Sequence, residues 1–136
     1  HPLDNLCVIL DYNKIQLDDF VKKVLDLEPV LEKWKGFGWP VIEIDGHDPA
    51  QIDKALDQAE AIKGRPTFIV AHTVKGKSVS FMENNPEWHG KAPKPQEAIR
   101  AIREIQGVAE AEWAAYLSVH AETAAIVREL EALEKK

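Results

Sequence analysis

The stretch GHDPAQIDKALDQAEAIKGRPTFIVAHTV, residues 46–74, predicts a helix followed by a buried strand. Asp48 stands as the helix N-cap, Pro49 as the first helical residue, and Gln51 completes a capping-box pattern. One apolar face follows at helical spacing, formed by Ile52, Ala55, Leu56, Ala59 and Ile62. The glycine and proline of GRP end the helix. The continuous apolar run PTFIVAHTV is typical of strands buried on both faces of a parallel sheet.

Two similar apolar runs precede this stretch, NLCVILDYN at 5–13 and WPVIEID at 39–45. Between them, LEPVLEKWKGFG predicts a short helix closed by glycine. The order strand, helix, strand, helix, strand predicts an α/β fold with a three-stranded parallel sheet and right-handed crossovers. A long loop then runs to about Pro95, and loops of this length are usually functional or disordered. We expect a short helix in PQEAIRAIREIQ and one long amphipathic helix over 107–136.

Composition restricts the partners and the setting of the chain. A formal net charge of −6 argues against nucleic acid as the main partner, because phosphate binding needs a basic surface. No apolar run approaches the roughly 20 residues of a membrane span. Cys7 is the only cysteine, which favours the reducing cytoplasm, and we interpret it as a small buried hydrophobe. The start HPLDNL lacks a methionine, so we expect further residues upstream.

Ligands of open parallel sheets bind beyond the carboxyl ends of the strands, so polar residues there are candidates. Asp11 and Asn13 follow the first strand and are hard oxygen donors of the type Mg²⁺ prefers. An Asx turn explains the same pair, and we favour the turn. DGHD at 45–48 offers a metal or acid–base cluster. The N-cap and a turn account for it better, and they leave His47 as a loop contact.

The segment KGKS, residues 75–78, is similar to the end of a phosphate-binding P-loop, but the match fails. That motif needs glycine where Ala71 stands, and it needs a helix directly after the lysine. Lys75 and Lys77 remain either contacts for an anionic ligand or part of a solvated basic loop.

Apart from His1 at the start of the sequence, three further histidines lie outside DGHD and differ in their surroundings. His72 at a strand end and His120 on a helix face are better explained as packing or surface residues. His89 differs, because Trp88 and Gly90 flank it at the end of the irregular stretch SFMENNPEWHG. A histidine held in this way is a candidate hydrogen-bond donor or acid–base group.

Taken together, three segments resemble the diphosphate-binding domain of transketolase, and most of all the N-terminal subunit of split-gene transketolases. The segments are LDNLCVILDYNKIQLDD, LEKWKGFGWPVIEIDGHD and KGRPTFIVAHTVKGKSVSFMENNPEWHGKAP, and the resemblance spans roughly residues 2–100. It implies a thiamine diphosphate enzyme that moves two-carbon ketol units between sugar phosphates. It also implies Mg²⁺ at the cofactor diphosphate and a partner, the complementary pyrimidine-binding subunit.

The resemblance assigns roles to individual residues. Asn13 matches an asparagine that holds the metal ion and the cofactor diphosphate, and Ile15 matches a backbone carbonyl ligand of the same ion. Lys75 matches a lysine that meets the cofactor. His89, in WHGKAP, matches a catalytic histidine near the reacting substrate.

The chain also departs from the family pattern. Lys14, Asp19 and Ser78 stand where glycine is usual or frequent, and no Gly-Asp-Gly, which carries the metal-binding aspartate, occurs anywhere. We therefore expect residues 1–106 to be the C-terminal part of the cofactor domain, followed by the helix of 107–136, and the fragment to be inactive alone. An exposed sheet edge predicts association into a homo- or hetero-oligomer. Deoxyxylulose-phosphate synthase, dihydroxyacetone synthase and a non-catalytic assembly module remain alternatives.

Overall fold

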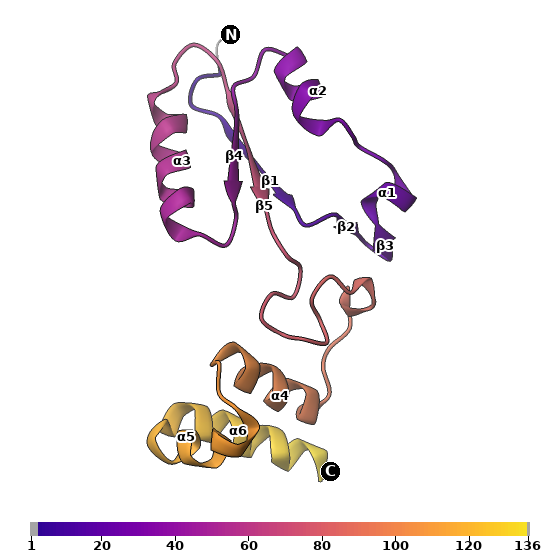
Figure 1. Ribbon diagram of the computed structural model, residues 1–136, viewed down its shortest axis with the longest axis vertical. Coiled ribbons are helices and arrows are strands. Elements are labelled where there is room, and N and C mark those ends of the chain that lie inside the picture. The colour runs from indigo at the N-terminus through magenta and orange to yellow at the C-terminus, as the bar shows by residue number, and fades with distance from the viewer. Residues whose placement is uncertain (1–2, 136) are drawn as a thin grey trace. The chain divides into compact units, whose positions relative to one another are not determined.

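The structure is a computed structural model that describes residues 3–135 (Figure 1). The chain forms two compact units, an N-terminal unit ending at Val74 and a C-terminal unit beginning at Lys75. Each unit is described by itself below. Within residues 3–135, no helix has the length and apolar character needed to cross a membrane.

The N-terminal unit contains the expected three-stranded parallel sheet. Its strands β1 (Cys7–Tyr12), β4 (Val41–Asp45) and β5 (Thr67–His72) lie in the order β1-β5-β4. The helices α2 (Val30–Gly36) and α3 (Pro49–Ala61) lie where the sequence predicts them. The pattern did not predict a small antiparallel pair, β2 (Ile15–Gln16) and β3 (Asp19–Phe20), followed by the single turn α1 (Val21–Val24).

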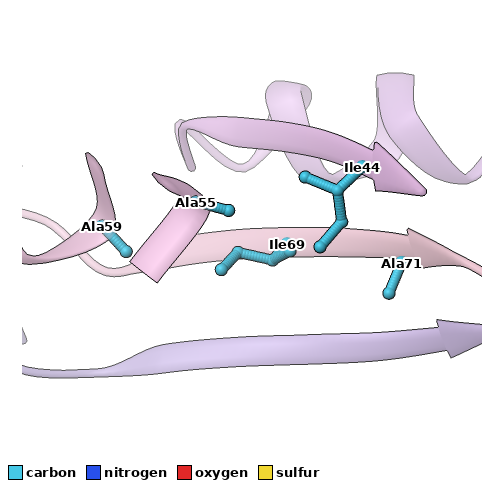
Figure 2. Close-up of a cluster of buried hydrophobic side chains, with 5 residues drawn as sticks. All are labelled: Ile44, Ala55, Ala59, Ile69 and Ala71. Carbon is cyan, nitrogen blue, oxygen red and sulfur yellow. The ribbon is translucent and has the colours of Figure 1, made fainter. Parts of the chain in front are cut away.

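Strand β5 lies at the centre of the core, and its side chains alternate between the two faces of the sheet. Ile69 and Ala71 face α3, where small side chains allow a close approach, and Figure 2 shows this cluster of Ile44, Ala55, Ala59, Ile69 and Ala71. On the other face Phe68 and Val70 pack with Val30 of α2. The Trp34 ring stacks on Phe68 with centroids 4.1 Å apart. The prediction of a strand buried on both faces is confirmed for β5.

The N-terminus of α3 is capped as the sequence predicts, with one change of partner. Asp48 Oδ1 accepts hydrogen bonds from the backbone N–H of Ala50 at 2.9 Å and of Gln51 at 3.4 Å. The Gln51 side chain accepts from the N–H of Asp45 at 3.0 Å rather than from that of the N-cap residue. The cap therefore also ties the start of α3 to the end of β4.

The prediction of full burial is wrong for β1 and for Cys7. Cys7 is exposed, and 56% of the Ile9 surface is exposed. Ile9 pairs with Ile69, so it lies on the α3 face of the sheet. The α3 cluster involves β4 and β5 only, and β1 is an edge strand of this sheet. The helix therefore leaves the β1 part of that face uncovered.

Gly46 lets the end of β4 close against the end of β5, which gives a first prediction. A Cβ added at Gly46 would lie 2.5 Å from Thr73 Cγ2 and 3.1 Å from Ala71 Cβ. We expect Gly46→Ala to lower the free energy of unfolding by about 2 kcal/mol, measured by urea denaturation. Gly36→Ala is the control, since an added Cβ there meets nothing within 4 Å and alanine favours the helix α2. Equal stability of the two variants would contradict the close approach.

The C-terminal unit contains the helices α4 (Pro95–Ile105), α5 (Trp113–Val119) and α6 (Ala121–Glu134), with short 3₁₀ turns η1 (Pro86–Trp88) and η2 (Glu110–Glu112) (Figure 1). The prediction of one long helix over 107–136 is wrong, because the helix breaks at His120, where φ is −116° and ψ is 77°. The His120 ring stacks on Tyr116 with centroids 3.7 Å apart. After the break α6 packs on α4, with Ala101, Ala124 and Val127 buried.

Candidate functional site

The carboxyl end of β1 holds the first group of candidate residues. Asp11 Oδ1 accepts a hydrogen bond from the Thr73 hydroxyl, which joins the ends of β1 and β5. Asp11 Oδ2 accepts from Asn13 Nδ2 at 3.2 Å, and Asn13 Oδ1 accepts from the Ile15 N–H at 2.9 Å. The second bond is the Asx turn that the sequence favours. A carbonyl oxygen has two lone pairs, so the turn leaves Asn13 Oδ1 able to accept a second partner.

The residues around this turn fit Mg²⁺ by chemical type but not by number. Asn13 Oδ1, the Ile15 carbonyl and the Asp11 carboxylate are hard oxygen donors. Mg²⁺ prefers an octahedral oxygen shell, and three protein donors leave half of it to other groups. Across residues 3–135 no cluster of three or more His, Cys, Asp or Glu side chains could hold a metal ion. A metal ion at this turn would need the cofactor, water or further protein ligands.

Lys14 lies between the two candidate metal ligands and adopts a left-handed backbone conformation, with φ at 63°. Its ammonium lies 5.5 Å from the centroid of the Tyr12 ring, a cation–π distance. This contact gives the lysine charge a partner within the N-terminal unit.

The segment DGHD serves the fold, as its pattern indicates. Asp45 Oδ1 accepts from the His47 N–H at 2.9 Å, and Asp48 caps α3. His47 Nε2 accepts from the Val74 N–H at 2.7 Å, so this histidine is the expected loop contact, at the end of the N-terminal unit. His72 is exposed, and its Nε2 lies 3.2 Å from Oε2 of Glu43 on the neighbouring strand, so it lies at the surface, one of the two places expected for it.

Lys75 begins a compact turn over residues 75–85, which we call the 75–85 turn. The Lys75 carbonyl accepts from the Asn84 N–H at 2.9 Å and closes the turn. Gly76, with φ at 72°, lies directly against Met82, since an added Cβ would be 2.7 Å from the Met82 backbone carbonyl. Val79 inside the turn is only 4% exposed. Residues 75–85, whose sequence shows no regular periodicity, are therefore tightly packed and hydrogen-bonded.

His89 stands at the end of the short η1 turn, in the same unit as Lys75. Asn85 caps this turn by accepting from the Glu87 N–H at 3.0 Å, and the His89 N–H donates to the Pro86 carbonyl at 2.9 Å. The residue is exposed, and within the described part of the C-terminal unit its imidazole has no hydrogen-bond partner. The η1 turn thus fixes the backbone of His89, and the residue is exposed.

The sequence did not single out the residues that fasten the 75–85 turn to α4. The Ser80 N–H donates to Glu104 Oε2 at 2.6 Å, and the Ser80 hydroxyl donates to Oε1 at 3.0 Å. Arg100 donates from Nε to the same Oε1 at 2.7 Å. The spacing of Arg100 and Glu104 on a predicted helix is a signal for their ion pair. No sequence signal connects Ser80 with Glu104.

These hydrogen bonds predict a pH dependence of stability. The Ser80 N–H, with Arg100 second, holds the pKa of Glu104 below its ordinary value. Because the folded pKa is depressed, the stabilisation is present above the unfolded pKa of about 4.3 and is lost as pH falls through the folded value. We expect Glu104→Gln to destabilise by about 1 kcal/mol at pH 7. Thermal melts should show this difference shrinking below about pH 4, and a difference independent of pH would contradict the role of the charge.

Comparisons with known proteins identify the family of the chain. The chain matches the family described as "Transketolase, thiamine diphosphate binding domain" over residues 1–136. It is 42% identical over 108 residues to an apulose-4-phosphate transketolase subunit from Actinobacillus succinogenes, covering 78% of this chain and 38% of that protein. It is 38% identical over 104 residues to a 6-deoxy-6-sulfo-D-fructose transketolase subunit from Clostridium sp. strain MSTE9, covering 76% of this chain and 38% of that protein.

A solved structure gives the same result for the fold. The transketolase of Campylobacter jejuni superimposes with a TM-score of 0.68 and 32% sequence identity, covering 79% of this chain and 17% of that chain. The chain spans 38% of the length of the subunits named above, so it corresponds to a part of each. The match over the whole chain, the identity to transketolase subunits and the shared α/β fold show that this protein belongs to the transketolase thiamine diphosphate-binding domain family.

Proposed function

We propose that this chain is part of a transketolase subunit that transfers two-carbon ketol units between sugar phosphates. The observation that carries the proposal is the match to the cofactor-binding domain over residues 1–136, together with similarity to proteins named as transketolase subunits. Asn13, Ile15, Lys75 and His89 all occur in segments that resemble this family.

The proposed cofactor is thiamine diphosphate with Mg²⁺. When bound, the cofactor supplies the nucleophilic carbon that takes up the two-carbon unit. On this proposal Asn13 Oδ1 and the Ile15 carbonyl hold the metal ion, and the Lys75 ammonium neutralises diphosphate charge. The two oxygen donors belong to the Asx turn after β1, which fixes their backbone. Rigid placement of this kind favours a site that binds without reorganisation.

His89 is the proposed catalytic residue for the substrate. Its exposed imidazole stands on a capped turn, and a neutral or protonated ring can donate a hydrogen bond to a sugar oxygen. Substrate oxygens change charge when the carbon–carbon bond is cleaved, so such a donor acts mainly in the transition state.

The proposed partner is a complementary pyrimidine-binding subunit, since the relatives above are named as subunits. We further propose that the working enzyme is an oligomer and that it acts in the cytoplasm. Support for association comes from the exposed apolar residues on β1 and in residues 17–27, namely Ile9, Leu17, Phe20, Val24, Leu25 and Leu27. A single cysteine suits a reducing compartment.

The test is reconstitution of the complete subunit with its complementary subunit. Ketol transfer from a ketose phosphate to an aldose phosphate should require both subunits, thiamine diphosphate and Mg²⁺. Each component is omitted in turn as a control. A folded, cofactor-loaded complex that transfers nothing from any of a panel of ketose phosphates would contradict the proposed function.

A second measurement concerns the 136-residue chain alone. The chain contains no Gly-Asp-Gly, and the turn after β1 offers Mg²⁺ too few oxygen donors. We therefore expect calorimetry with thiamine diphosphate and Mg²⁺ to show an affinity weaker than micromolar. Micromolar binding that depends on Mg²⁺ would show that these residues hold the cofactor unaided.

A further inference from the structure

A small, exposed polar network joins helix α4 to the 75–85 turn. Glu104 accepts both hydrogen bonds of Ser80, and Arg100 Nη2 donates to the Ser80 hydroxyl at 2.8 Å as well as pairing with Glu104. The Arg100 guanidinium also lies 5.0 Å from the centroid of the Phe81 ring. Two consecutive residues of the turn, Ser80 and Phe81, are thus fixed by one turn of α4.

A line of aromatic contacts continues from Phe81 to the candidate catalytic histidine. The Phe81 ring meets Trp88 edge to face with centroids 5.2 Å apart. The Lys91 ammonium lies 4.5 Å from the centroid of the Trp88 ring. Trp88 is the last residue of η1, and His89 directly follows it. The contacts thus run in sequence from Arg100 through Phe81 to Trp88 and Lys91, and Trp88 is the residue before His89.

We infer that Arg100 and Glu104 are positioning residues for His89, acting through Phe81 and Trp88. This inference rests on the proposed function, because it concerns the same histidine. Neither residue need touch the substrate. The guanidinium fixes the Phe81 ring, the ring fixes Trp88, and Trp88 fixes the backbone that presents the imidazole. Misplacing a catalytic group by about 1 Å can cost up to about 10²-fold in rate.

A structural role alone would have a different consequence. The Arg100 side chain is 53% exposed, and ion pairs of such residues contribute little to stability. Arg103 on the same helix pairs with Glu110 at 3.0 Å and is only 17% exposed. If stability were all that mattered, replacing Arg103 should be at least as harmful as replacing Arg100. Arg103 has neither the ring contact nor the Ser80 contact of Arg100, so it is a matched control.

The first experiment compares Arg100→Met with Arg103→Met in the complete two-subunit enzyme. We expect Arg100→Met to lower kcat about tenfold, with the donor KM and the apparent thiamine diphosphate affinity within about threefold of the parent. Arg103→Met should keep the parental kcat. Phe81→Leu should reproduce the loss, and the double variant Arg100→Met/Phe81→Leu should lose no more than the worse single variant, because both act along one path. Parental kcat in Arg100→Met would overturn the inference.

The second experiment needs no activity and separates this inference from the proposed function. In the 136-residue chain, NMR signals of the Trp88 indole and the His89 ring should shift in Arg100→Met and Phe81→Leu. They should stay in place in Arg103→Met, with His89→Ala used to assign the ring signals. Unmoved signals would overturn the inference even in an active enzyme. An inactive parent complex with shifted signals would instead contradict the proposed function alone.

Discussion

Replacing His89 by alanine is expected to lower the turnover of the complete enzyme about 10²–10⁴-fold, the range of a lost general acid–base contact. The apparent affinity for thiamine diphosphate should stay within a few-fold of the parent. The residue is exposed and its ring has no hydrogen-bond partner within the described C-terminal unit, so removing the ring should leave the turn intact. Steady-state rates with a ketose phosphate donor, measured beside melting temperatures, check both statements.

Two further variants sharpen this prediction. His120→Ala removes an exposed histidine of the same unit and should keep the parental rate, although it loses the stack on Tyr116. His89→Gln retains a hydrogen-bond donor, so it should keep more of the parental rate than His89→Ala does. A parental turnover in His89→Ala, at unchanged stability, would assign the segment Ser80–Gly90 a purely structural role.

Local signals explain why most of the N-terminal unit could be predicted from the sequence. Asp48, Pro49 and the small residues of α3 specify the helix start and its buried face without reference to the rest of the chain. The uniform apolar character of β5 reflects its central place between β1 and β4. Strand β1 has the same character in sequence, yet its exposure depends on strand order, and periodicity carries no information on that order.

The C-terminal unit was harder to predict because its structure depends on contacts between distant residues. The sequence around His120 contains no glycine or proline, so nothing local marks the break between α5 and α6. The 75–85 turn depends on Gly76 lying against Met82 and on Ser80 meeting Glu104, 24 residues away. Length alone indicated only that this loop was functional or disordered.

The backbone conformation explains why glycine is usual at two positions where this chain departs from the family pattern. Lys14 and Ser78 stand where the resemblance leads us to expect glycine, and both have positive φ, 63° and 70°. Glycine adopts this conformation without a steric cost, whereas other residues need compensating contacts. Lys14 has the Tyr12 ring, and the Ser78 N–H donates to Glu83 Oε1 at 2.7 Å. The conformation that glycine favours is thus kept in spite of the substitutions.

Asn13→Ala is expected to act on cofactor retention rather than on turnover. With the metal ligand removed, the apparent affinity for thiamine diphosphate at limiting Mg²⁺ should fall about 100-fold. Turnover at saturating cofactor and Mg²⁺ should recover to within a few-fold of the parent, because the residues that meet the substrate are unchanged. Titrations of activity with cofactor at two Mg²⁺ concentrations measure the difference.

The Asx turn complicates this variant, because Asn13→Ala also removes the acceptor of the Ile15 N–H and the donor to Asp11. Asn13→Asp separates the two roles. An aspartate keeps an oxygen for the Ile15 N–H and an oxygen for the metal ion, so the turn and the ligand both remain. It also places a second carboxylate within reach of Asp11, where the Asn13 amide now lies 3.2 Å from Oδ2.

The repulsion between these two carboxylates allows a melting experiment to detect metal binding. Without Mg²⁺ the Asn13→Asp enzyme should have a lower melting temperature than the parent, because the two carboxylates repel each other. Adding Mg²⁺ with thiamine diphosphate should raise its melting temperature more than that of the parent, since the cation offsets the like charges. Asn13→Ala should gain the least from the same addition. Asn13→Ala could instead lose stability but bind cofactor as the parent does at every Mg²⁺ concentration. That result would make Asn13 a turn former only, and its side-chain oxygen would not be a metal ligand.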